Sequence, residues 1–226
     1  MNRLLSIVTI LFCAFSIAQN PIEMTISDFD TIKVFDLVTV NLVKSSENKI
    51  IISGKDADDV EYVQKNGLLK VRMRSEKTFD GTKTFVHVYY KELDIIDANE
   101  GARVLSNELI EQDRLEIKVQ EGAMVTAGLT VKNLDVRAVT GGIVRLSGQV
   151  EDQILVVNTG GKVENEKLKS DYSKVKVQAG GEVEIFATQS VDINVRAGGD
   201  VVVYGNPKDV KKKTLFGGRI KIVDND

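Results

Sequence analysis

The sequence is poor in the residues that usually build compact sites or cross-links. Its 226 residues contain one cysteine, one histidine, two prolines and no tryptophan. One cysteine excludes a disulfide framework and a four-thiolate zinc site. Lysine and arginine total 30 against 33 acidic residues, so there is no basic excess to hold a nucleic-acid backbone. With 42% hydrophobic and 28% charged residues, a disordered tail and a polytopic membrane protein are excluded as well.

The first 18 residues have the pattern of a secretory signal peptide. Arg3 supplies the positive n-region, residues 4–15 form an apolar stretch, and Ser-Ile-Ala ending at Ala18 is a small-x-small cleavage site. The apolar stretch is too short to span a bilayer, and a buried N-terminal helix is the alternative. Cys13 follows a bulky residue, which disfavours lipidation. We expect an exported chain of residues 19–226, in the periplasm, on the cell surface or secreted, with no transmembrane segment after cleavage.

A glycine-centred segment recurs seven times in the remaining sequence. It reads NEGARV, QEGAMV, VTGGIV, NTGGKV, QAGGEV, RAGGDV and LFGGRI, with spacings of 21, 19, 19, 20, 18 and 19 residues. These segments hold 12 of the 18 glycines. The first glycines of the seven segments are Gly101, Gly122, Gly141, Gly160, Gly180, Gly198 and Gly217.

Apolar residues recur at fixed distances from these glycines. Five residues before stand Ile96, Ile117, Val136, Leu155, Val175 and Ile193; three before stand Ala98, Val119, Ala138, Val157, Val177 and Val195. Three after stand Val104, Val125, Val144, Val163, Val183, Val201 and Ile220. This alternation predicts a strand on each side of a glycine corner.

The repeat predicts an all-β fold, a parallel β-helix (solenoid) with coils of about 19–20 residues. Each unit is too short to bury its apolar face alone, so stacked units would form continuous ladders of valine and isoleucine. We expect one domain over residues 19–226, with regular coils over 93–226. Residues 19–92 are predicted to form irregular N-terminal coils that cap the solenoid. An antiparallel sandwich or a propeller is the alternative, although a propeller blade needs about 40 residues.

Three motifs in this arrangement resemble a family of exported bacterial domains, the putative auto-transporter adhesins with a head GIN domain. They are FDTIKVFDLVTVNLV from Phe29, YYKELDIIDANEGARV from Tyr89, and YGNPKDV with GGRI near the end. The resemblance covers roughly residues 29–223. It implies a single-stranded right-handed β-helix, an envelope or surface location, and adhesion. The small hydroxyl residues that often follow the corner glycine are replaced by Arg103, Met124, Ile143, Lys162, Glu182 and Asp200.

Two rows of polar residues are candidate sites. An acidic row is predicted on one face of neighbouring rungs, where it would bind Ca²⁺ or act as an acid/base pair. Because Lys162 and Arg219 border that row, a merely solvated charged face is the alternative. An outward amide row is predicted two residues before the corners; it would support the coil by stacked hydrogen bonds or receive carbohydrate or protein. The acidic row is Glu164, Glu182, Glu184 and Asp200; the amide row is Asn99, Gln120, Asn158 and Gln178.

Signatures of catalysis are missing from the sequence. His87 is the single histidine, and we interpret it as an incidental surface or packing residue. No GxSxG elbow, HExxH motif or phosphate-binding loop occurs. We therefore predict a non-enzymatic exported β-helix, an adhesin or a surface or periplasmic binding and structural module, without cofactor or metal. Its partner would be a carbohydrate or protein at the cell envelope, and homo-oligomerisation stays open. The alternative is a polysaccharide-active enzyme using the acidic row.

Overall fold

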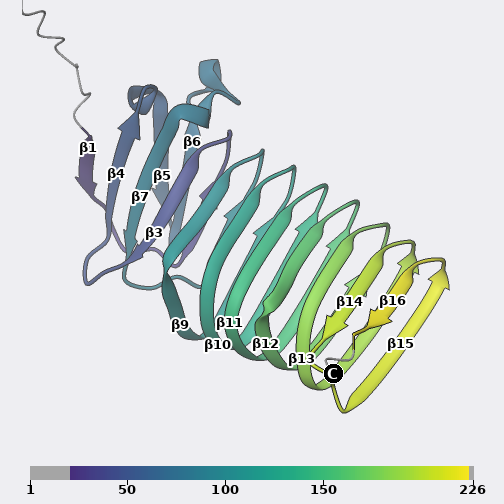
Figure 1. The fold of residues 1–226 in the computed structure, drawn as a ribbon. Coiled ribbons are helices and arrows are strands. Elements are labelled where there is room, and N and C mark those ends of the chain that lie inside the picture. Colours follow the sequence, from purple (N-terminus) through teal and green to yellow (C-terminus); the bar gives the residue numbers. More distant parts are fainter. Residues whose placement is uncertain (1–20, 224–226) are drawn as a thin grey trace, which may run out of the picture.

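The protein is a β-solenoid of about seven turns, seen here in a computed structural model that describes residues 21–223 (Figure 1). The predicted parallel β-helix is thereby confirmed. The predicted signal peptide, including Cys13, lies outside the described residues. Within residues 21–223 no helix is long and apolar enough to cross a membrane.

Each regular turn is formed by one long strand that bends as it goes round. Neighbouring turns pair in parallel and in register, for example through Val125, Val144 and Val163. The strands of this part are β8 (Ile95–Ala98), β9 (Arg103–Val119), β10 (Met124–Val139), β11 (Ile143–Asn158), β12 (Lys162–Val177), β13 (Glu182–Ala197), β14 (Asp200–Tyr204), β15 (Asp209–Phe216) and β16 (Arg219–Ile222).

The core is a set of apolar ladders that run along the solenoid axis. Each ladder residue predicted five or three positions before a corner glycine is at most 2% exposed. The same holds for the residues three positions after the first six corner glycines. At the seventh glycine, Ile220 is partly buried against the core. The ladders are therefore the ones that the sequence alternation predicts. They form because adjacent turns place equivalent side chains one above another.

The glycine corners need glycine for two different reasons, which Gly141 and Gly142 illustrate. Gly141 has φ +74°, and the preceding Thr140 has φ +49°, so the pair forms a turn in the left-handed region. Gly142 donates a hydrogen bond from its N–H to the carbonyl oxygen of Val139 at 2.9 Å, which closes the turn. A Cβ on Gly142 would lie 2.3 Å from the carbonyl oxygen of Val119 on the preceding turn. The first glycine thus allows the turn and the second allows the close stacking.

The N-terminal part differs from the predicted coils. Its strands β2 and β3 extend the solenoid in parallel, but β1 pairs antiparallel with β4, β4 with β7, and β5 with β6. Ile26 and Phe29 are buried in the segment that joins β1 to β2. The elements are β1 (Ile22–Thr25), β2 (Thr31–Val34), β3 (Thr39–Lys44), β4 (Lys49–Gly54), η1 (Ala57–Asp59), β5 (Val60–Lys65), β6 (Leu68–Met73), η2 (Ser75–Lys77), η3 (Gly81–Lys83) and β7 (Thr84–Tyr90).

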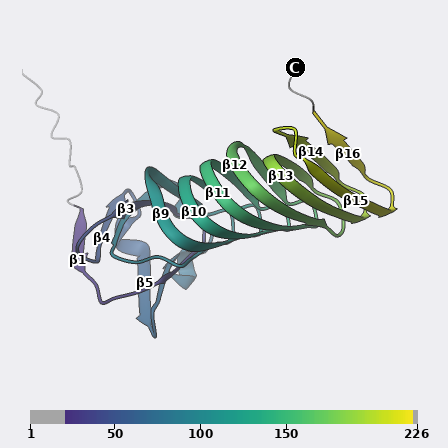
Figure 2. The ribbon, with the colours of Figure 1, turned by 90° about the horizontal axis from the view of Figure 1, so that it is seen from below.

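Two sheet faces result from this topology, and each has a free edge at both ends of the solenoid. The β14 face runs from β1 through β4, β7, β3 and the first halves of β9–β13 to β14 and β16. The β15 face runs from β5 through β6, β2, β8 and the second halves of β9–β13 to β15. Figure 2 shows β1 and β5 at one end of the molecule and β15 and β16 at the other.

Differences in turn length are absorbed where the long strands bend from the β14 face. The 21-residue turn carries its two extra residues between Leu105 and Leu109 of β9, opposite Thr126 and Gly128. The 20-residue turn carries its extra residue after Glu164 of β12. Between β9 and β10 and between β11 and β12 the rest of the turn keeps its register, whereas β12 and β13 shift a second time between Ser170 and Tyr172. The ladder positions stay paired on both sides of these shifts, as Val163 does with Val183 and Val175 with Ile193.

Candidate functional site

The acidic row lies on the outer side of the β14 face. Glu164 is in register with Glu184, and Glu182 with Asp200. These carboxylates are interleaved with cations: the Lys162 Nζ lies 3.2 Å from Glu164 Oε1 and 3.0 Å from Glu182 Oε2. The row is therefore a charge-balanced surface rather than a stack of unpaired acids.

Ion pairing also sets the protonation of this row. Hydrogen bonding to Arg145 lowers the pKa of Glu164, and a two-pronged contact from Arg219, at 2.7 and 2.8 Å, lowers the pKa of Asp200. A carboxyl with a lowered pKa stays ionised at neutral pH, which does not suit a general acid. Within residues 21–223 no group of three or more His, Cys, Asp or Glu side chains has the arrangement to hold a metal ion. The structure lends no support to the Ca²⁺ site or the acid/base pair.

The amide row is interrupted, and its first member is covered by its neighbours. Asn99 is 3% exposed, and its Nδ2 donates to Asp97 Oδ1 at 3.0 Å, on the side of the strand opposite the buried Ala98. Gln120 Nε2 donates to Asn99 Oδ1 at 2.8 Å, which is the kind of stacked amide bond the sequence predicts. Val139 then interrupts the row, and Asn158 Oδ1 is a buried atom without a hydrogen bond among the described residues. Gln178 is exposed. The row supports the first coils but forms no continuous polar surface.

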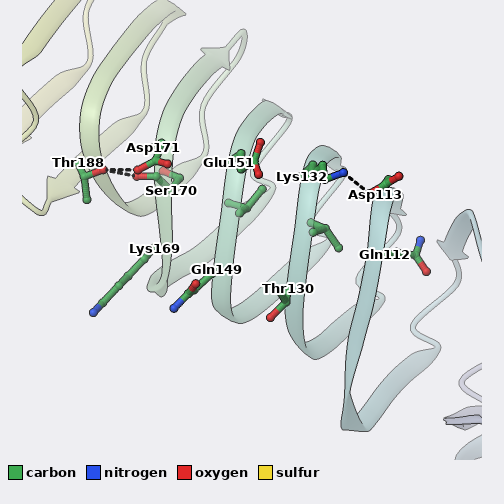
Figure 3. A pocket seen from close by; sticks show the side chains of 12 residues that line it. Gln112, Asp113, Thr130, Lys132, Gln149, Glu151, Lys169, Ser170, Asp171 and Thr188 are labelled. Carbon is green, nitrogen blue, oxygen red and sulfur yellow. Dashed lines mark hydrogen bonds and ion pairs between the residues drawn. The ribbon is translucent and has the colours of Figure 1, made fainter.

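A groove with a volume of about 550 Å³ crosses β9 to β13 where the long strands bend towards the β15 face. Figure 3 shows its side chains on successive turns. Its floor includes Val131 and Val150, each 4% exposed. The residues before and after each floor position point outward, because side chains alternate along a strand. One wall consists of Thr130, Gln149 and Lys169; the other consists of Asp113, Lys132, Glu151 and Asp171, with Thr188 beyond.

The groove walls offer both hydrogen-bond donors and acceptors, with little net charge. Lys132 Nζ lies 2.8 Å from Asp113 Oδ1, and this contact raises the pKa of the Lys132 ammonium group. Asp171 Oδ1 accepts a hydrogen bond from Thr188 Oγ1 at 2.7 Å. Counted over its charged lining residues, the groove has three carboxylates and two ammonium groups, a formal balance of −1. Such a lining suits a ligand rich in hydroxyl groups better than a highly charged one.

A second hollow, with a volume of about 730 Å³, lies at the corner where turn length varies. The inserted segments around Glu108 and Glu166 flank it, and Gly128 lies between them. Glu108 Oε2 accepts a hydrogen bond from the N–H of Lys44 at 3.1 Å, whereas Glu166 Oε2 is a buried atom without a hydrogen bond among the described residues. The insertions thus make a depression that the regular repeat does not produce.

A serine-histidine catalytic pair is not formed. Ser170 lines the groove, but its Oγ lies 2.6 Å from Ser173 Oγ and 2.7 Å from the carbonyl oxygen of Phe186, so it serves the interior of the solenoid. His87 lies on β7, five strand positions from β12, a separation of about 24 Å at the usual spacing of neighbouring strands. It is half-buried between the buried Val86 and Val88, on the opposite side of the strand, as the alternation predicts.

The groove and the hollow were not among the sites predicted from the sequence. For the hollow, the departures of the repeat spacing to 21 and 20 residues are a sequence signal, because an extra residue must bulge outward when the ladders stay in register. The groove has no comparable signal, since it depends on where the strands bend.

The sequence from residue 28 to 207 matches the model of a protein family described as "Putative auto-transporter adhesin, head GIN domain". The chain belongs to this family. Solved structures share the fold of this head GIN domain. A "putative adhesin" from Bacteroides fragilis NCTC 9343 superposes with a TM-score of 0.83 at 21% identity, over 90% of this chain and 96% of that one.

Two further structures resemble this head GIN domain less closely. A "putative adhesin" from Parabacteroides merdae ATCC 43184 and a "putative lipid binding protein" from Parabacteroides distasonis ATCC 8503 each have a TM-score of 0.69 and 18% identity. Each match covers 91% of this chain and 96% of the other. At these identities the likeness shows the fold alone. No curated protein matches the sequence significantly.

Proposed function

We propose that residues 19–226 form an exported binding module of the cell envelope that holds an extended, hydroxyl-rich polymer, a polysaccharide strand, in the groove across β9 to β13. The observation that carries this proposal is the direction of the groove, which runs along the solenoid axis over successive turns. Its polar side chains recur once per turn, at about 4.8 Å. That repeat is close to the length of one sugar unit in an extended chain.

The lining favours a neutral or weakly charged polymer. Thr130, Gln149 and Lys169 present a hydroxyl, an amide and an ammonium group on one side, and Glu151 and Asp171 present acceptors on the other. Val131 and Val150 give a narrow apolar floor. Each turn contributes a few hydrogen bonds of modest net value, so useful affinity requires several turns to be occupied together.

Binding is tested by titrating soluble polysaccharides, neutral glucans and galactans and acidic uronans, into residues 19–226 in a calorimeter. We expect affinity to rise with oligosaccharide length up to the span of the groove. The double variant Gln149→Ala/Lys169→Ala should weaken binding at least about tenfold, the equivalent of about 1.4 kcal/mol. Lys174→Ala/Lys176→Ala, on the β15 face of the same turn, is the matched control and should bind as the parent does. No binding to the panel, or binding that the groove variant leaves intact, would overturn the proposal.

Turnover is the outcome that would favour an enzyme instead. The same polysaccharides should be recovered undegraded after incubation. If the protein releases reducing ends and Glu184→Gln abolishes this release, the protein is a polysaccharide-active enzyme that uses the acidic row, and not only a binding module.

Export is tested separately, with the full 226-residue chain expressed in a Gram-negative host. We expect the processed protein in the envelope or culture fraction, with Gln19 as its first residue. An intact chain that begins at Met1 and stays in the cytoplasm would contradict the signal-peptide prediction.

A further inference from the structure

The two ends of the solenoid carry unpaired sheet edges. On the β15 face, β5 pairs with β6 and β15 pairs with β13, and no other described strand covers their outer edges. On the β14 face the corresponding edges are β1 and β16. Rows of free N–H and C=O groups make each edge a template for another strand.

These ends also expose apolar side chains. On β5, Tyr62 is 37% and Val63 is 47% exposed; on β15, Leu215 is 58% and Phe216 is 74% exposed. Inside the C-terminal end, Val210 is only partly buried against the core. A strand laid on β15 would cover part of this apolar surface, as each turn covers the one before it.

The two ends of the β15 face have opposite charge. Residues 55–65 contain four acids and two lysines, a formal charge of −2, whereas residues 209–216 contain three lysines and one aspartate, a formal charge of +2. Asp56 and Asp59 at one end, and Lys212 and Lys213 at the other, form no ion pair with another described residue. Like ends therefore repel one another, while unlike ends attract.

We propose that the C-terminal end of one copy docks on the N-terminal end of a second copy, so that β15 continues into β5 of the next molecule and the copies add head to tail. Strand directions fit: β5 is antiparallel to β6, and β6 has the same direction as the turns that lead to β15. The new pair is antiparallel. With Lys213 opposite Glu61, Asp209 falls opposite Lys65, which places opposite charges across the joint twice.

The same register keeps the interior side of both strands aligned. Tyr62 pairs with the buried Val71, and Lys212 pairs with the buried Ile193, so both face the interior side of the sheet. The register places the Lys212 ammonium group opposite the Tyr62 ring, an arrangement favourable to a cation–π contact. Because the joint uses two different surfaces, it does not close on itself and leads to an open chain of copies rather than a dimer. The lysines that keep β15 from pairing with another β15 are thus the groups that recognise the acidic end.

Analytical ultracentrifugation of residues 19–226, which include every described strand, tests the proposal. We expect the weight-average mass to rise with concentration beyond that of a dimer at low salt, and to fall as added salt screens the joint. The tail variant Lys212→Glu/Lys213→Glu should lower the association constant at least about tenfold. The head variant Asp56→Lys/Asp59→Lys should do the same.

The four-substitution variant that combines both reversals gives the head a formal charge of +2 and the tail one of −2, so the two ends attract again. Because Lys213→Glu still lies opposite Glu61, this variant should recover only part of the association that each reversal loses. Lys174→Glu/Lys176→Glu changes the net charge as the tail variant does, but in the middle of the β15 face, and should leave association intact. Circular dichroism spectra and melting curves confirm that each variant is folded. A mass independent of concentration, assembly that stops at the dimer, or a four-substitution variant as monomeric as the two-substitution ones would overturn the head-to-tail joint. None of these readouts involves the groove, so they stand apart from the polysaccharide proposal.

Discussion

Gly148 and Gly128 occupy neighbouring turns at the same corner, yet substitution by alanine should affect them very differently. Gly148 has φ +109°, a conformation that L residues rarely adopt, and a Cβ there would lie 2.1 Å from the carbonyl oxygen of Leu129. Backbone strain of this kind costs about 1–3 kcal/mol. Moving the neighbouring turn away by about 1 Å adds about 1–3 kcal/mol of overpacking and strained hydrogen bonding. Gly148→Ala should therefore destabilise the protein by about 2–6 kcal/mol.

Gly128 provides the matched control. Its φ is not positive, and a Cβ there would meet Leu109 Cδ1 at 3.4 Å and Ser147 Oγ at 3.8 Å, which are ordinary contacts. Alanine at such a position reduces the conformational freedom of the unfolded chain, so Gly128→Ala should be neutral or stabilise by about 0.4–1 kcal/mol.

Thermal and urea unfolding of residues 19–226, followed by far-UV circular dichroism, measure both effects. For a chain of this length, 1 kcal/mol corresponds to about 2–4 °C, so Gly148→Ala should melt about 4–24 °C lower and Gly128→Ala within about 4 °C of the parent. If both variants lost the same stability, the corner would respond to a Cβ in the same way at Gly148 and at Gly128. The backbone contact with Leu129 would then be irrelevant to stability.

Three further substitutions test the ladders, the corners and their charge. Val157→Asp places a carboxylate at a position with 0% exposure and should cost several kcal/mol or prevent folding. Ile154→Asp, at a position with 43% exposure on the same strand, should cost less than about 1 kcal/mol. Equal melting temperatures of the two variants would refute the ladder register. Thr140→Asn, at φ +49° before Gly141, should raise the free energy of unfolding by about 0.5–1 kcal/mol, since asparagine suits this turn; a urea midpoint that falls would contradict this. Burial, and then the nearby Asp36 carboxylate, raises the pKa of Glu100, so its ionisation opposes folding. Glu100→Gln should therefore melt higher than the parent at pH 7, and the difference should vanish below the ordinary glutamate pKa of 4.5; a difference that grows in acid would reverse the assigned sign.

The regular part of the fold follows from the sequence because one constraint is repeated seven times. A single Val-x-Val pattern, such as that around Val175 and Val177, is ambiguous, but its recurrence at a fixed distance from glycine leaves stacking as the consistent solution. Burial of those ladder positions confirms this. The repeat also led to the family, since its motifs span most of the chain.

The strand pairing of the irregular N-terminal part was not predicted from the sequence, because no repeat constrains it. Strands such as β4 (KIIISG) and β5 (VEYVQK) have the same alternation whether they pair parallel or antiparallel. For β5 and β6 the sequence does hold a signal, because Asn66-Gly67, both with positive φ, form a two-residue hairpin turn between them. The partners of β4 are β1 and β7, which are distant in sequence, so no local pattern indicates these pairings. The burial of Asn99 has no signal in the sequence either, because it depends on side-chain contacts with Asp97 and with Gln120 of the next turn.

Surface chemistry was the least predictable level. The alternation of residues groups the acidic row, but its ion pairs depend on which residue of the adjacent turn lies opposite, as with Lys162 between Glu164 and Glu182. A shift of one residue in a single turn exchanges such partners. The groove depends on the bend of the strands near Val131 and Val150, which is a property of several turns together.

The direction of the inter-turn hydrogen bonds has a mechanical consequence. They run along the solenoid axis, and the two ends of the described chain lie at opposite ends of that axis (Figure 2). Tension between these ends pulls along the bonds and peels the molecule open one turn at a time, each turn giving way after its neighbour. Tension across the axis is instead shared by several turns at once. The load that the solenoid withstands therefore depends on where it is held.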